Sequence, residues 1–290
     1  MKEHFRKMIE NNRWIKGIPN SLTLCNSLCG FASILITIQA YKYVNDPGAV
    51  AKVFAWSAAM ILFAMVFDAF DGYAARILNA ASMHGIQMDS LADMVTFGVA
   101  PATLVAVMAH HMRHIDTLKG FIPVCILSAV YLGGAALRLA TYNVHAIQDK
   151  KEKKSSGDKF SGLPSPGAAA AICSVVIFVA YRDGKVDRLL QYLPWYTAAL
   201  GLLMVSKVPY IHFAKWLLST KRNKKRLLFL IVILFLWIIT GFAFSNPIIV
   251  PLILINGYVI WGPLTSIAVK IGFITPRPEL VPDIAEHKDS

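Results

Sequence analysis

Four aspartates lie close together in an apolar stretch of the chain, FDAFDGYAARILNAASMHGIQMDSLADMVTF. Residues three or four apart share a face of a helix, so Asp68 and Asp71 form one pair, and Asp89 and Asp93 form a second. An ionised aspartate near hydrocarbon is costly, and such a residue usually faces a polar cavity and serves a function. Two antiparallel helices carrying these pairs would direct all four carboxylates at one point.

Four carboxylates at one point require neutralisation by protons or cations, because like charges repel strongly at short range in a medium of low dielectric constant. Carboxylate oxygens are hard ligands and favour a hard cation, so we expect Mg²⁺ or Mn²⁺, as one ion or as two ions bridged by shared carboxylates. Such ions usually keep coordination positions for phosphate oxygens. Helix capping would explain one or two aspartates, since helix N-termini favour anions, but not four at this spacing.

The residues between the carboxylates favour a site that handles phosphate. Gly72 and Gly85 remove side chains where a substrate could approach the backbone closely. Arg76, one turn beyond Gly72, offers N–H donors to phosphate oxygens. Each residue also has a plain structural interpretation, because Gly72 could serve helix packing and Arg76 could extend to the membrane interface.

The composition places this site in a membrane protein. Of 290 residues, 56% are hydrophobic and 16% are charged, and the mean hydropathy of +0.53 is far above that of an ordinary soluble domain. A membrane-spanning helix needs about 20 mostly apolar residues. We therefore expect an all-α polytopic membrane helix bundle with about eight transmembrane helices, near residues 20–41, 49–76, 86–109, 120–141, 164–181, 191–213, 226–244 and 246–269.

The net charge of +12 is explained by membrane topology and does not require a nucleic-acid partner. If the N-terminus is cytoplasmic, 20 of the 29 lysines and arginines fall in segments on the cytoplasmic side, with clusters at 150–159 and 215–226. Seven fall in segments on the other side. Basic residues are enriched in cytoplasmic loops, so we expect both termini in the cytoplasm, the aspartates near the cytoplasmic face, and no nucleic acid as partner. The basic loops could also attract anionic lipid head groups.

The chain divides into four parts by this pattern. Residues 1–19 are basic and precede a full-length span rather than a short signal core, so we expect a retained amphipathic arm at the cytoplasmic interface, or a frayed tail. Residues 20–213 would form the core, with about six transmembrane helices. Residues 214–270 would add two more helices, and residues 271–290 would form a cytoplasmic tail.

The aspartates and the residues between them follow a spacing found in a known family. The pattern Asp68-x2-Asp71-Gly72-x2-Ala75-Arg76-x8-Gly85-x3-Asp89-x3-Asp93 resembles the signature of the CDP-alcohol phosphatidyltransferase family. Four further stretches resemble the phosphatidylserine synthase branch of that family. They are IPNSLTLCNSLCGF at 18–31, AALRLATYNV at 135–144, FSGLPSPGAAA at 160–170 and LLMVSKVPY at 202–210.

The resemblance implies a reaction in which the hydroxyl of L-serine attacks the phosphatidyl phosphorus of CDP-diacylglycerol and CMP leaves. It implies that Asp68, Asp71 and Asp89 are metal ligands. Asp93 is implied as the general base and as a further ligand of the metal site. The CDP-binding residues implied by the resemblance are Asn20, Thr23, Asp68, Gly72, Ala75, Arg76 and Gly85.

The serine site is predicted from charge. Arg138 is the only basic residue within the fourth apolar run, so it is our candidate for binding the serine carboxylate, with Asn143 and Lys159 as supports. The alternative is that Arg138 only extends to the inner membrane interface.

Two other functions remain open at this point. A sibling transferase would use glycerol 3-phosphate or an inositol phosphate as acceptor, and would need a denser basic pocket than this sequence shows. A cation transporter would use the aspartates as an ion path, but their clustering at one membrane face argues against it. The expected location is the cytoplasmic membrane of a prokaryote, in contact with membrane lipids. A homodimer is compatible with the resemblance.

Overall fold

The described part of the chain is helical. A computed structural model of the protein describes residues 13–78, 82–112, 117–152, 162–182, 187–208, 210 and 248–271, and these residues contain no strand, which confirms the predicted all-α class. The helices are α2 (Arg13–Ile38), η1 (Gln39–Tyr43), α3 (Pro47–Ile77), α4 (Met83–Asp93), η2 (Met94–Val99), α5 (Ala100–Met112), α6 (Leu118–Glu152), α7 (Ser165–Tyr181), α8 (Asp187–Val205) and α11 (Ile249–Lys270).

Helices occupy seven of the eight predicted spans, and the eighth, 226–244, lies outside the described residues. Among those residues, five helices are long and apolar enough to cross a membrane, and α7 and α8 are shorter apolar helices. The third predicted span corresponds to α4, η2 and α5, which run on as one helix from Met83 to His111. The predicted polytopic membrane class is therefore confirmed.

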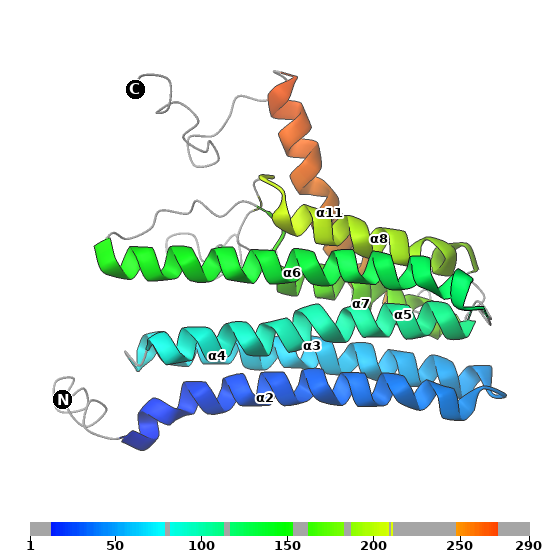
Figure 1. Cartoon of the computed structure of the whole chain (residues 1–290), viewed down its shortest axis with the longest axis horizontal. Helices are drawn as coiled ribbons and strands as arrows, with labels where there is room; N and C mark the ends of the chain where they lie inside the picture. The colour runs from blue at the N-terminus through cyan, green and yellow to red at the C-terminus, as the bar shows by residue number, and fades with distance from the viewer. Residues whose placement is uncertain are drawn as a thin grey trace.

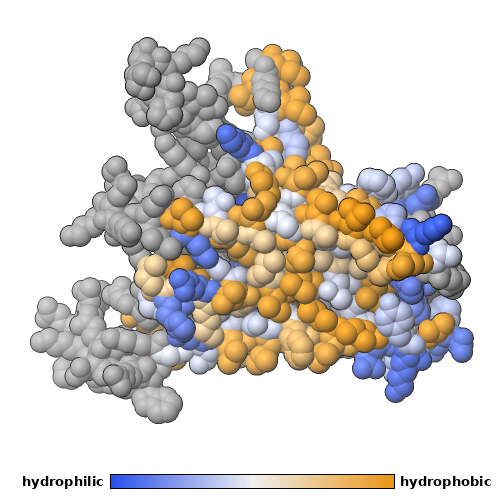
Figure 2. All heavy atoms as spheres, viewed as in Figure 1, coloured by the Kyte–Doolittle hydropathy of each residue, from blue (hydrophilic) through white to orange (hydrophobic). Residues whose placement is uncertain are grey.

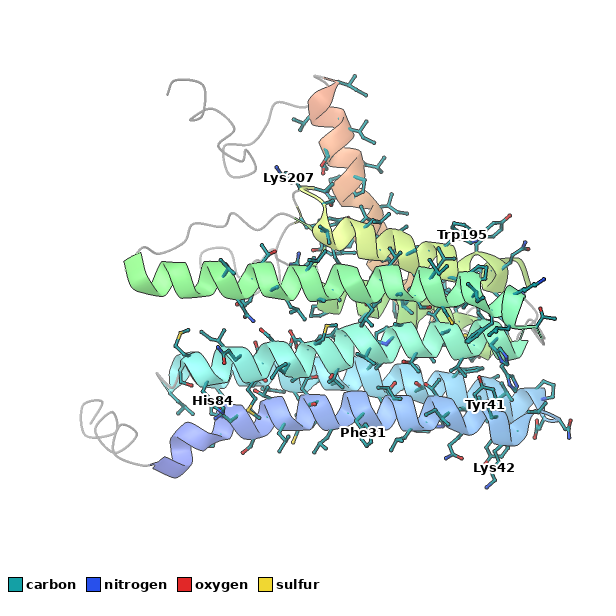
Figure 3. The ribbon with its side chains drawn as sticks, viewed as in Figure 1. Phe31, Tyr41, Lys42, His84, Trp195 and Lys207 are labelled. Atoms are coloured by element: carbon teal, nitrogen blue, oxygen red, sulfur yellow. The ribbon has the colours of Figure 1, made fainter. Side chains whose placement is uncertain are left out.

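The helices α2 to α6 lie side by side along the long axis of the molecule (Figure 1). Hydrophobic atoms cover the middle of the bundle, whereas hydrophilic atoms gather toward its two ends (Figure 2). Large apolar side chains point outward from the bundle, including Phe31 near its middle, which is 53% exposed, and Trp195 on α8, which is 64% exposed (Figure 3). An exposed apolar belt of this extent fits a lipid environment, so the long axis runs across the membrane.

The aspartate motif lies at one end of this axis. The C-terminus of α3, the start of α4 and the N-terminus of α2 meet at the end marked by His84, whereas Tyr41 and Lys42 lie at the opposite end (Figures 1 and 3). That this end faces the cytoplasm stays a prediction from the charge pattern.

Hydrogen bonds between buried hydroxyl groups join α2 to α3. Ser33 Oγ and Ser57 Oγ are 2.8 Å apart, and Thr37 Oγ1 lies 2.6 Å from Ser57 Oγ. All three side chains are fully buried. Such pairs matter in a membrane because lipid tails remove most of the hydrophobic contribution to helix association.

Two helix ends differ from the expected boundaries. The sixth span was expected to reach residue 213, but α8 ends at Val205, because Ser206 turns back to donate to Leu203 O at 2.7 Å and a proline follows Val208. Helix α6 continues to Glu152 instead of ending near residue 141. At 1.5 Å per residue its 35 residues span about 52 Å, so it extends beyond a hydrocarbon core of about 30 Å.

Candidate active site

Three of the four aspartates converge at the motif end of the bundle. Asp68 and Asp71 lie one turn apart near the C-terminus of α3, and Asp89 lies on α4. One carboxylate oxygen from each of these residues lies within 4.8 Å of the other two. The expectation that the two helices direct their carboxylates at one point is therefore met by these three. Asp93 lies one turn further along α4, where its carboxyl is hydrogen-bonded to that of Asp68 and also accepts a hydrogen bond from Asn26 on α2.

The carboxylate oxygens of these three aspartates are suitable ligands for a hard divalent cation. Asp71 is only 5% exposed, and Asp89 Oδ1 is buried without a hydrogen-bond partner among the described residues. A buried carboxylate oxygen without a donor is costly. A cation coordinated by oxygens from all three side chains would satisfy it.

Helix α2 contributes a hydrogen-bond donor to each pair of aspartates. Thr23 Oγ1 lies 2.8 Å from Asp71 Oδ2, to which it donates, and 3.0 Å from Pro19 O. Asn26 Nδ2 donates to Asp93 Oδ1 over 3.2 Å. Thr23 was predicted as a site residue, but Asn26 was not. Its signal in the sequence is its position, one turn after Thr23 in a run without charged residues.

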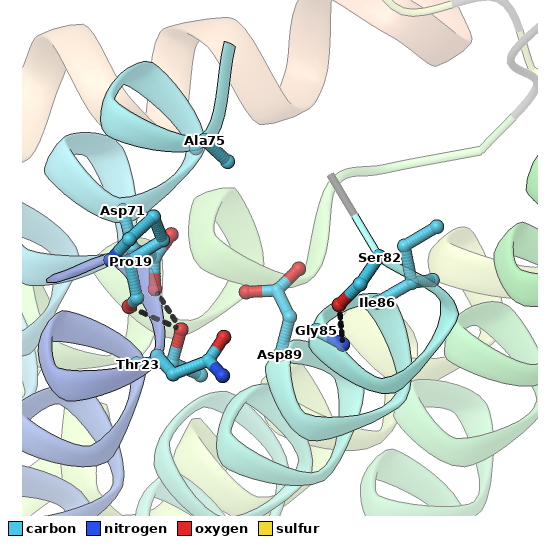
Figure 4. A pocket seen from close by; sticks show the side chains of 10 residues that line it. Pro19, Thr23, Asp71, Ala75, Ser82, Gly85, Ile86 and Asp89 are labelled. Carbon is cyan, nitrogen blue, oxygen red and sulfur yellow. Dashed lines mark hydrogen bonds between the residues drawn. The ribbon is translucent and has the colours of Figure 1, made fainter. Parts of the chain in front are cut away.

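A pocket opens beside the carboxylates, between α2, α3 and α4 (Figure 4). Its cavity volume of about 100 Å³ is well below the range of about 300–1,000 Å³ for sites that enclose a whole ligand. It can therefore hold a phosphate group and ions, while the rest of a nucleotide would lie outside. The lining residues are Pro19, Asn20, Thr23, Asp71, Gly72, Ala75, Ser82, Gly85, Ile86 and Asp89, which include five of the seven residues predicted to bind CDP.

The wall formed by α4 begins with a capped helix N-terminus. Ser82 has an extended backbone, and its Oγ accepts a hydrogen bond of 2.9 Å from Gly85 N, as a serine N-cap does. A Cβ on Gly85 would lie 3.1 Å from Ser82 Oγ, so this turn is tightly packed. Sequence reasoning missed Ser82 and Ile86, although a serine three residues before Gly85 is a recognisable cap.

Arg138 and Asn143, the two predicted serine-binding residues that the structure describes, lie against different segments. Arg138 Nη1 lies 3.2 Å from the position that a Cβ on Gly162 would take, so it lies against the turn before α7. Asn143 Oδ1 accepts a hydrogen bond of 2.7 Å from Ser90 Oγ on α4, beside Asp89. Five residues along a helix turn a side chain through about 140°, which explains the different neighbours. The site itself stays a prediction.

Two predicted site residues cannot be placed. Arg76 belongs to α3 by its backbone, but its side chain lies outside the described part. Lys159 lies outside the described residues altogether.

The sequence matches the CDP-alcohol phosphatidyltransferase family over residues 16–261. It is 34% identical to the CDP-diacylglycerol–serine O-phosphatidyltransferase of Bacillus subtilis over 198 residues, 68% of this chain and 92% of that protein. It is 28% identical to the same enzyme of Helicobacter pylori strain J99 over 259 residues, 88% and 93% of the two chains. It is 30% identical to the archaetidylserine synthase of Methanothermobacter thermautotrophicus over 195 residues, 67% and 69%. The family match includes all four aspartates and extends beyond residue 213, where the predicted core ends.

Proposed function

Because this chain belongs to the CDP-alcohol phosphatidyltransferase family, we propose that it transfers the phosphatidyl group of CDP-diacylglycerol to the hydroxyl of L-serine, forming phosphatidylserine and CMP. The observation that carries this proposal is the convergence of Asp68, Asp71 and Asp89 beside a phosphate-sized pocket. Serine as the acceptor is supported by the relatives, since the enzymes from two bacteria and an archaeon all have serine in their names.

The three converging aspartates would hold the metal. The family is generally dependent on divalent metal ions, and we propose Mg²⁺ or Mn²⁺, as one ion or two. Such an ion, when bound, neutralises the pyrophosphate and the charge that develops on the departing CMP. Thr23 orients Asp71 through its hydroxyl. Gly72 and Ala75 leave the pocket open for the phosphate groups.

Asp93 would act as the general base, beside the metal ligands. It accepts the proton of the serine hydroxyl as the serine oxygen bonds to phosphorus, and the bond between that phosphorus and the CMP oxygen breaks. Its position one turn from Asp89 on the same helix face supports this role. We assign the serine carboxylate to Arg138, with support from Asn143 and Lys159.

The protein is an integral membrane protein. We propose the inner membrane of a prokaryote, with both termini in the cytoplasm, because the basic segments then face inward. This orientation exposes the pocket to cytoplasmic serine while α2 and α3 stay in contact with the lipid that carries the donor. A homodimer is the assembly that we would test first.

The decisive experiment is an acceptor panel. Purified protein in detergent receives CDP-diacylglycerol, Mn²⁺ and either serine, glycerol 3-phosphate or inositol phosphate, and CMP release is measured. We expect release with serine, its loss in EDTA, and recovery when Mg²⁺ or Mn²⁺ is returned.

Three results would contradict parts of this proposal. Release with a phosphorylated acceptor but not with serine would identify a sibling transferase. Full activity in metal-free buffer would refute the role of the aspartates as metal ligands. Cation uptake into proteoliposomes without any CMP release would identify a transporter.

A further inference from the structure

Asn26 is an amide buried in the membrane-spanning part of α2. Its side chain is completely inaccessible to solvent, and burying an amide in an apolar environment is costly unless it is hydrogen-bonded. Its Nδ2 donates to Asp93 Oδ1 over 3.2 Å, while its Oδ1 has no partner among the described residues. The reverse orientation of the amide would place two oxygens against each other, so the N–H group must face Asp93.

The backbone around Asn26 is held against the helix that carries Asp93. Thr96 Oγ1 donates to the carbonyl oxygen of Asn26 at 3.0 Å. One turn further along α2, a Cβ on Gly30 would lie 2.5 Å from Thr96 Oγ1 and 2.8 Å from Thr96 Cα, so the two helices touch at this point. The distance between Asn26 and Asp93 is thereby set by backbone packing rather than by flexible side chains.

The segment after Asp93 is a π-helix, Met94–Val99. Such segments are rare and often lie at functional sites. This one is anchored on two sides, by the bond from Thr96 to α2 and by Tyr131 OH of α6, which donates to Phe97 O at 2.7 Å. These anchors fix the rotation of the helix immediately after Asp93.

From these contacts we propose that Asn26 is a positioning residue for Asp93. It holds Oδ1 of that carboxylate and so orients the other oxygen for the proton of the acceptor hydroxyl. A role in packing alone would satisfy both halves of a buried amide, whereas among the described residues the only side-chain partner of Asn26 is Asp93. The inference rests on the proposed function, in which Asp93 is the general base.

The test compares two variants of α2. Asn26→Leu removes the donor and keeps the number of side-chain heavy atoms. Ser33→Ala, two turns further along, removes a buried interhelical hydrogen bond to Ser57 and is the matched control. We expect Asn26→Leu to lower kcat about 10-fold to 100-fold with little change in the KM for CDP-diacylglycerol. Ser33→Ala should lower the melting temperature in detergent but keep kcat.

A double variant decides whether Asn26 acts through Asp93. Residues that act as a unit are not additive, so Asn26→Leu combined with Asp93→Asn should release CMP no more slowly than Asp93→Asn alone in single-turnover measurements. Normal kcat in Asn26→Leu, full additivity in the double variant, or an equal loss of kcat in Ser33→Ala would each overturn the inference.

The proposed function is tested separately by the wild-type protein. All variants are measured with the acceptor that gives CMP release in the panel. A change of acceptor would therefore revise the function without affecting the comparison of Asn26 with Ser33.

Discussion

At the scale of single residues, the pocket beside the aspartates depends on small side chains that leave space. Gly72 lines this pocket, and a Cβ added there would meet no atom within 4 Å. The glycine is therefore not required by packing against the protein. Its helix would tolerate a larger residue, so the space it leaves is available to a substrate.

Gly72→Ala should separate stability from activity. Replacing a glycine inside a helix by alanine stabilises it by roughly 0.5–1 kcal/mol, so the melting temperature should stay level or rise. The added methyl group occupies the pocket, and we expect the KM for CDP-diacylglycerol to rise about tenfold. Gly133→Ala on α6, which also has open space around its Cβ, is the control and should leave the KM unchanged. An equal KM for CDP-diacylglycerol in both variants would show that Gly72 is not part of the site that binds this substrate.

Arg138 is the second residue whose role is open to kinetic measurement. If it binds the serine carboxylate, Arg138→Ala should raise the KM for serine about 10-fold to 100-fold, because a hydrogen bond to a charged group contributes about 1.5–3 kcal/mol. The KM for CDP-diacylglycerol should hardly change. Arg138→Lys keeps the positive charge but lacks the planar guanidinium group. Its KM for serine should therefore lie between those of the wild type and Arg138→Ala.

The position of Arg138 against the Gly162 turn provides the competing explanation. Unchanged serine kinetics together with a lower melting temperature in Arg138→Ala would assign this residue to holding that turn, and the serine site would have to be sought elsewhere.

At the scale of elements, the site depends on how closely α2 approaches the helix formed by α4 and η2. Gly30 and Thr96 form the point of contact, and the aspartates Asp71 and Asp93 each receive a hydrogen bond from α2. Helices associate in lipid through small residues that let the backbones approach. Gly134 and Gly201 do the same between α6 and α8, where a Cβ on Gly134 would overlap the carbonyl oxygen of Gly201.

Gly30→Ala should therefore destabilise the bundle despite the better helix propensity of alanine. The new Cβ would overlap Thr96, including its backbone, and we expect a loss of about 1–3 kcal/mol in the free energy of unfolding. Gly17→Ala on the same helix adds a Cβ into open space and serves as control. Denaturant unfolding in detergent gives both values, and equal stability of the two variants would contradict the contact.

At the scale of the whole molecule, the orientation in the membrane determines which substrates reach the pocket. The 20 to 7 distribution of basic residues predicts that the aspartate end faces the cytoplasm. Serine and CMP are soluble and charged, so the enzyme can exchange them only with the compartment that this end faces.

Cysteine labelling would check this orientation. After replacement of Cys25, Cys29, Cys125 and Cys173, single cysteines introduced within 150–155 and 221–226 should react with a membrane-impermeant reagent only in inverted vesicles. A cysteine at residue 42, at the opposite end of the bundle, should react only from outside. Labelling of the first two sites from outside would invert the proposed topology.

The sequence by itself determined the membrane class, the positions of seven helices and the candidate metal ligands. These properties are local: hydropathy over about 20 residues marks a span, and a spacing of three or four residues places Asp68 with Asp71 and Asp89 with Asp93 on shared helix faces. The resemblance to the family added seven candidate CDP-binding residues, of which Asn20, Thr23, Gly72, Ala75 and Gly85 line the pocket.

Only the tertiary structure decided which faces of distant helices meet. It grouped Asp68, Asp71 and Asp89, joined Asp93 both to Asp68 and to Asn26 of α2, and set Arg138 and Asn143 against different segments. These outcomes depend on the rotation and separation of whole helices. The close approach of Gly30 to Thr96 sets that separation, and the π-helical turn after Asp93 shifts the register of every side chain that follows. Because both arise from packing between segments about 70 residues apart, no periodicity within either segment predicts them.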